Sequence, residues 1–144
     1  MLSQYAPVVF WMAVIFYLSS DQGSMSQTSR FIRPLLEFLF HAAPEQTLLI
    51  YHGYIRKAAH FTEYAVLAFL AVRALSIPAT VWLHEWRYIL PLLLVVAVAA
   101  IDEFNQSFEI SRTGSILDVM LDISGGVVMI TMLFLLKLPN INHR

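Results

Sequence analysis

The sequence contains no cysteine, and charged residues make up only 13% of its 144 positions. The absence of cysteine excludes disulfides, thiol nucleophiles and thiolate-ligated zinc or iron–sulfur centres, so only oxygen and imidazole groups remain for chemistry. The formal net charge is −1 and the few Lys and Arg residues are scattered, which excludes the broad basic surface that nucleic acid requires. We therefore expect no nucleic-acid partner.

Hydrophobic residues dominate the composition. They account for 58% of the chain, and the mean hydropathy is +0.66. A membrane span needs about 20 mostly apolar residues to cross a ~30 Å hydrocarbon core. Four stretches approach this length: 2–18, 58–77, 86–101 with a polar continuation to 108, and 116–138. The sequence predicts an all-α polytopic membrane protein with four transmembrane helices in a single domain, residues 1–144.

The first of these stretches is interpreted as a retained span. It is short, but no Lys or Arg precedes Arg30, whereas a cleavable signal peptide would begin with a positively charged region.

A long connection, residues 19–55, separates the first two spans and becomes apolar again after its initial Ser, Asp and Gly residues. Apolar residues recur near helical spacing at Phe31, Ile32, Leu35, Leu36, Phe38 and Leu39. Arg30, Arg33 and Glu37 alternate with them. The pattern predicts a short amphipathic helix that either lies in the membrane interface or covers the ends of the spans. His41 and His52 are interpreted as interfacial polar residues.

Ionisable residues gather at one predicted face of the membrane. The chain reverses direction with each span, so the end of the first, the start of the second, the end of the third and the start of the fourth meet there. The polar residues at these positions are Ser19, Ser20, Asp21, Arg56, Lys57, His60, Glu63, Asp102, Glu103, Asn105, Gln106, Arg112, Asp118 and Asp122. Residues three or four apart share one side of a helix, so three helices each offer a polar stripe. Gly125 and Gly126 permit close approach of the last span, and we expect the stripes to converge.

Two interpretations of this cluster are open. In one, it is an ion-pair and hydrogen-bond network that only holds the helices together, with Arg56, Lys57 and Arg112 neutralising the acids. In the other, it is a functional site, which we favour because the acidic residues and histidine exceed what helix association needs. Ionisable residues inside a membrane usually mark functional sites.

Two segments closely resemble the VanZ-like membrane proteins: "RKAAHFTEYAVLAFL", residues 56–70, and "DEFNQSFEISRTGSILDVMLDISGG", residues 102–126. The resemblance covers about 54–126, and "FYLSSDQGSMSQTSR" at 16–30 resembles a weaker signature. The family pattern is matched by Lys57, His60, Glu63 and Tyr64, then by Asp102, Glu103 and Gln106, and then by Arg112, Asp118 and Asp122. Asn105 departs from it, since many members have His there.

The resemblance implies an association with resistance to the glycopeptide teicoplanin. Glycopeptides act at the outer surface on lipid-linked cell-wall precursors or the surrounding membrane. We therefore expect a bacterial, multi-pass protein of the cell inner (cytoplasmic) membrane, with both termini cytoplasmic and a polar site on the outer face that acts on or binds a lipid-linked envelope component. The alternatives are a non-catalytic lipid or glycopeptide binding protein and a small cation- or proton-coupled transporter. The oligomeric state stays open.

Roles within the cluster follow from the side-chain chemistry. His60 is the group best suited to carry a proton near neutral pH. We assign catalytic roles to His60, Glu63, Asp102 and Glu103, and substrate-binding roles to Lys57, Gln106, Arg112, Asp118 and Asp122. No cofactor is expected, and the nearby cations favour ion pairing over an open metal site. Whether the protein is an enzyme stays open.

Overall fold

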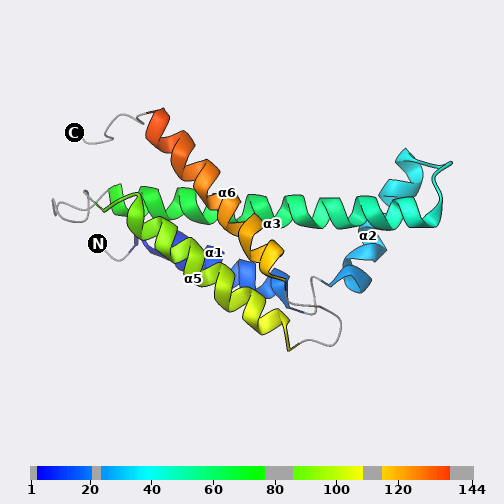
Figure 1. Ribbon diagram of the computed structural model, residues 1–144, viewed down its shortest axis with the longest axis horizontal. Coiled ribbons are helices and arrows are strands. Elements are labelled where there is room, and N and C mark those ends of the chain that lie inside the picture. The colour runs from blue at the N-terminus through cyan, green and yellow to red at the C-terminus, as the bar shows by residue number, and fades with distance from the viewer. Residues whose placement is uncertain (1–2, 21–23, 77–85, 109–114, 137–144) are drawn as a thin grey trace.

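The computed structural model describes residues 3–20, 24–76, 86–108 and 115–136 (Figure 1). The described helices are α1 (Ala6–Ser19), α2 (Met25–Leu39), α3 (Glu45–Ser76), α5 (Ile89–Gln106) and α6 (Ile116–Leu135). These described ranges contain no strand. The predicted all-α class is therefore confirmed.

Three helices, α3, α5 and α6, are long and apolar enough to cross a membrane. The apolar α1 has only 14 residues, and at about 1.5 Å per residue it reaches ~21 Å, short of a ~30 Å hydrocarbon core. Three of the four predicted spans are thus matched by helices of sufficient length. The first span stays a prediction.

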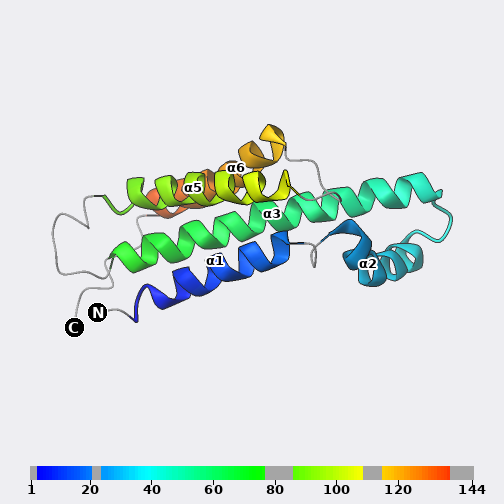
Figure 2. The same cartoon turned by 90° about the horizontal axis from the view of Figure 1, so that it is seen from below.

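The helix α3 is longer than the predicted span, because it begins at Glu45 instead of residue 58. The carbonyl of Pro44 accepts hydrogen bonds from the amides of Thr47 and Leu48, which starts the helix directly after the proline. The 32 residues of α3 extend over about 48 Å, well beyond a ~30 Å core. Its N-terminal part consequently projects beyond α1, α5 and α6 (Figure 2).

The predicted amphipathic helix is α2, which packs beside the projecting part of α3 (Figure 2). Leu36 is buried in this contact, and the Thr28 hydroxyl lies 3.1 Å from Nε2 of the buried His52. Arg33 donates to Glu45 at 2.7 Å across the two helices. The side chains of Phe31 and Phe38 remain exposed, as expected for a helix with one apolar face at a membrane interface.

The bundle of α1, α3, α5 and α6 has two distinct ends (Figures 1 and 2). At one end α1 and α5 begin and α3 and α6 finish. At the other end α1 and α5 finish and α6 begins, all beside the middle of α3. This arrangement brings together the helix ends that carry the predicted polar stripes.

The packing partner of α3 is chiefly α6, which crosses it obliquely (Figure 1). A Cβ atom built on Gly125 would collide with the carbonyl oxygen of Phe61, and one built on Gly126 would lie 2.7 Å from Cγ1 of Val95. The two glycines therefore let α6 contact the backbone of α3 and the side chains of α5 at once. Small residues permit such close helix contacts in membranes.

Candidate functional site

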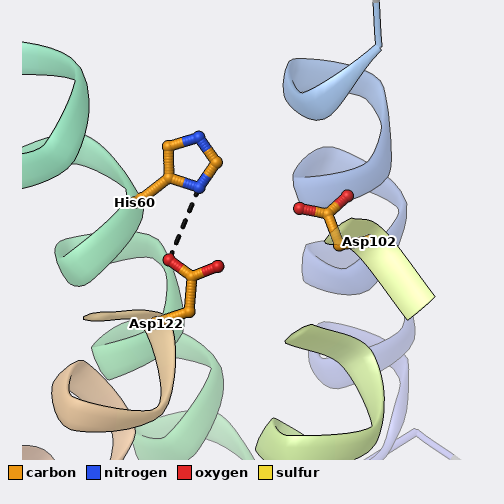
Figure 3. Close-up of side chains that lie close together, drawn as sticks. All are labelled: His60, Asp102 and Asp122. Carbon is orange, nitrogen blue, oxygen red and sulfur yellow. Dashed lines mark ion pairs between the residues drawn. The ribbon is translucent and has the colours of Figure 1, made fainter. Parts of the chain in front are cut away.

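Three ionisable side chains from three different helices lie close together where the predicted polar stripes of these helices meet (Figure 3). They are His60 of α3, Asp102 of α5 and Asp122 of α6, and one ligating atom of each lies within 4.8 Å of the others. Asp102 is 1% exposed and Asp122 is 0% exposed. The His60 side chain is 15% exposed, so the cluster is closed on the carboxylate side and reachable at the imidazole.

The contact between His60 and Asp122 is a loose ion pair. Nδ1 of His60 lies 3.5 Å from Oδ1 of Asp122, beyond the usual N–H···O range. Among the described residues, neither oxygen of Asp122 has a hydrogen-bond partner, and neither does Nδ1 of His60. Buried polar atoms are nearly always hydrogen-bonded, so these three atoms are exceptional among the described residues.

Asp102, in contrast, is held firmly. Its Oδ2 accepts hydrogen bonds from the Ser19 hydroxyl at 2.7 Å, from Nε2 of Gln106 at 3.0 Å and from the Tyr64 hydroxyl at 3.4 Å. The donors come from α1, α5 and α3, so four helices contribute to the site once Asp122 of α6 is included. The donors orient the carboxylate toward the other two ionisable side chains.

The depth of the site follows from its position on α3. At about 1.5 Å per residue, His60 lies ~24 Å along the helix from Ser76, and Arg56 lies ~30 Å from it. A ~30 Å hydrocarbon core measured from Ser76 would therefore end near Arg56 and Lys57, one turn beyond His60. On this measure, the site would lie just inside the boundary between the hydrocarbon and the headgroups.

The other predicted catalytic residues lie around the cluster. Glu103 is buried, and its Oε1 accepts the amide of Ser115, the N-cap residue of α6. It thereby ties the end of α5 to the start of α6. Glu63 is partly exposed, and its backbone carbonyl accepts the Trp11 indole N–H at 2.9 Å.

The predicted substrate-binding residues are distributed unevenly. Asp122 and Gln106 belong to the cluster, Asp118 lies in the first turn of α6, and Lys57 is exposed. Arg112 lies outside the described residues, so the idea that it neutralises the acids stays a prediction.

Two residues of the site were not among the assigned site residues. Ser19 and Tyr64 both donate to Asp102. The spacing offers a signal for Tyr64, one turn after His60, whereas Ser19 is only the last residue of an apolar helix. Its partner is far away in the sequence, so only the fold identifies its role.

Comparisons with known proteins identify the family of the chain. The family model described as VanZ/LLP1 matches residues 5–137. No curated protein and no solved structure matches the chain. The matched region contains every helix described above and spans far more than half of the sequence, so the chain belongs to the VanZ/LLP1 family.

Proposed function

We propose that this protein is a multi-pass protein of the bacterial cytoplasmic membrane that acts on the polar part of a lipid-linked envelope component, using His60, Asp102 and Asp122. In this proposal all four apolar helices span the membrane, both termini are cytoplasmic and the site faces outward. The association of VanZ proteins with teicoplanin resistance would reflect a change in the envelope that the glycopeptide encounters.

The observation that carries the proposal is the unsatisfied carboxylate of Asp122. It is fully buried, and its two oxygens have no hydrogen-bond partner among the described residues. A network whose only task was to hold helices together would gain most by satisfying every buried polar atom, because an unpaired one costs about 1–3 kcal/mol. A site that awaits a ligand retains unused acceptors instead.

The chemistry available is proton transfer. The His60 imidazole can accept and return a proton near neutral pH, and the facing Asp122 carboxylate can stabilise the imidazolium that forms. Asp102, held by its three donors, can accept a hydrogen bond from a hydroxyl or amine of the substrate. Positioned acid–base groups of this kind contribute typically ~10²–10⁴-fold to a rate.

The location supports a lipid headgroup as the substrate. The cluster lies about one turn inside the boundary near Arg56 and Lys57, where headgroups are within reach, and the imidazole is the exposed part of it. Lys57 is exposed beside this boundary and can attract the phosphate of a lipid-linked component.

Two variants test the proposal in cells. Expression of the wild type is expected to raise teicoplanin resistance and to change the extracted envelope lipids, and His60→Ala and Asp102→Asn are expected to abolish both effects while protein abundance stays near wild type. Asn at 102 keeps an oxygen that can accept from Ser19, so the fold is retained. Glu45→Gln, a carboxylate change on α3 outside the site, is the matched control and should retain the phenotype.

Loss of abundance would contradict the proposal. Breaking a buried ion pair that only supports the fold costs about 3–5 kcal/mol, which would deplete folded protein in the His60→Ala strain. Saturable binding of an envelope lipid with no covalent change would instead establish the binding-protein alternative.

A further inference from the structure

We infer that His60, Asp102 and Asp122 bind one divalent metal ion, with Zn²⁺ or Mn²⁺ as the suitable class. This inference rests on the same site as the proposed function, and with the ion bound His60 would act as a ligand instead of as the proton carrier. It differs from the sequence-based expectation of ion pairing, because the structure places an imidazole nitrogen and two carboxylates around one point.

The geometry matches the spacing of metal ligands. Bonds of about 2.0–2.2 Å to nitrogen and oxygen place neighbouring ligand atoms of a tetrahedral site ~3.4 Å apart. Nδ1 of His60 and Oδ1 of Asp122 are already 3.5 Å apart. The third ligand, Asp102, completes a set in which one ligand atom of each residue lies within 4.8 Å of the others.

The unsatisfied atoms are the same ones that the ion would contact. Nδ1 of His60 and both oxygens of Asp122 lack hydrogen-bond partners in the described ranges, and Asp122 is fully buried. With a neutral imidazole, two ionised carboxylates carry a charge of about −2, which is costly to bury without a cation. A divalent ion would cancel this charge and satisfy all three unpaired atoms together.

The surroundings of Asp102 resemble the outer shell of a metal site. Carboxylates that bind metals are themselves hydrogen-bonded, which fixes the direction of their free lone pairs. Ser19, Gln106 and Tyr64 all donate to Oδ2 of Asp102. A carboxylate anchored through one oxygen presents the other to the ion.

The donor set selects the class of ion. One imidazole and two carboxylates suit Zn²⁺ or Mn²⁺ better than the all-oxygen coordination that Ca²⁺ and Mg²⁺ prefer. Three protein ligands leave at least one position for water or a substrate oxygen, as in catalytic zinc sites. A phosphate or hydroxyl oxygen of a lipid headgroup is the ligand that fits this position.

The test is metal stoichiometry in the full-length protein in lipid nanodiscs. The protein is stripped with a chelator, equilibrated with Zn²⁺ alone or Mn²⁺ alone, washed and analysed by mass spectrometry of the elements. One ion per chain is expected for the wild type and for Glu45→Gln, and none for His60→Gln or Asp122→Asn. Added metal should also raise the melting temperature of the wild type but not of Asp122→Asn.

A milder variant keeps the test valid if Asp122→Asn folds poorly. Ser19→Ala retains all three ligands and removes the hydroxyl that donates to Asp102, so the metal affinity should fall by about 10–100-fold. Wild-type protein that binds no stoichiometric ion, or an unchanged affinity in Ser19→Ala together with full binding by Asp122→Asn, overturns the inference.

The two proposals fail separately. If wild-type protein binds no metal while His60→Ala still abolishes the cellular phenotype at normal abundance, the metal inference is wrong and the proposed function stands. If one ion binds per chain but the phenotype survives His60→Ala, the ion is structural and the proposed function is wrong.

Discussion

Three glycines in the helices offer a graded test of the packing that brings the site together. Each is replaced by alanine, which adds a single methyl group and changes no charge. Gly125 faces the backbone of α3, Gly126 faces a side chain of α5, and Gly53 lies in the projecting part of α3 with nothing within 4 Å of its added Cβ.

The expected magnitudes follow from what the new methyl group meets. At Gly125 it collides with the carbonyl oxygen of Phe61 and lies 3.0 Å from the carbonyl carbon. A backbone carbonyl in a helix cannot rotate away, so α6 must move off α3, at a cost of about 1–3 kcal/mol for overpacking. At Gly126 the nearest atom is Cγ1 of the Val95 side chain, 2.7 Å away. This side chain has to shift within the core, and an off-rotamer displacement costs about 0.5–1.5 kcal/mol, less than moving one helix off another.

At Gly53 the added methyl group has no atom within 4 Å. Gly53→Ala should therefore raise the free energy of unfolding by about 0.5–1 kcal/mol, because glycine loses more backbone entropy than alanine when a helix forms. The free energy of unfolding should therefore decrease in the order Gly53→Ala, wild type, Gly126→Ala, Gly125→Ala. Titration with denaturant in detergent micelles, followed by far-UV circular dichroism, measures this order.

A Gly125→Ala protein as stable as the wild type would refute the close approach of α6 to α3. Such a result would also remove the basis for placing Asp122 beside His60, because Gly125 and Asp122 lie one turn apart on α6 and Phe61 follows His60 directly. The matched expectation is that Gly125→Ala weakens metal binding more than Gly126→Ala does.

Three further predictions concern topology and the hydrogen bonds around the site. In the cysteine-free background, a single cysteine at Gln27 should react with an impermeant maleimide in intact cells, and one at Ser3 should react only after permeabilisation; the reverse pattern would invert the proposed orientation. Glu103→Ala should destabilise the protein by about 1–3 kcal/mol, because the partly buried amide of Ser115 loses its carboxylate acceptor. Glu103→Gln should keep most of that stability, and equal losses in both variants would contradict this role. Tyr64→Phe should cost less than about 1.5 kcal/mol, since the 3.4 Å hydroxyl contact is long, and a loss above ~3 kcal/mol would indicate a stronger bond.

The fold was largely predictable because its strongest signals are local. Apolar runs near the length of a membrane core identified the helices later found as α3, α5 and α6, and the amphipathic spacing around Arg30–Leu39 identified α2. The start of α3 at Glu45 was not predicted. Hydropathy indicates which residues prefer lipid, and it does not indicate where a helix begins. The residues after Pro44 form the first turns of α3, in the part of this helix that projects beyond the other helices.

The candidate site was predictable in its residue types and less so in its partners. Alternating span direction placed His60, Asp102 and Asp122 at the same end of the bundle, and the structure brings them together. The pairing of Asp122 with the imidazole of His60 depends on the angle at which α6 crosses α3. That angle is set by which small residues meet which backbone, and no spacing within one helix specifies it.

The sequence by itself determined that the chain is helical, prefers lipid and carries several ionisable groups near one membrane boundary, because composition and periodicity act within each helix. Only the tertiary structure decided which groups meet. Ser19 and Asp102 are 83 residues apart along the chain, and their contact exists because α1, α3, α5 and α6 end or cross at one place. Helix packing, governed by the steric contacts of Gly125 and Gly126, selects these partners from the many that the sequence allows.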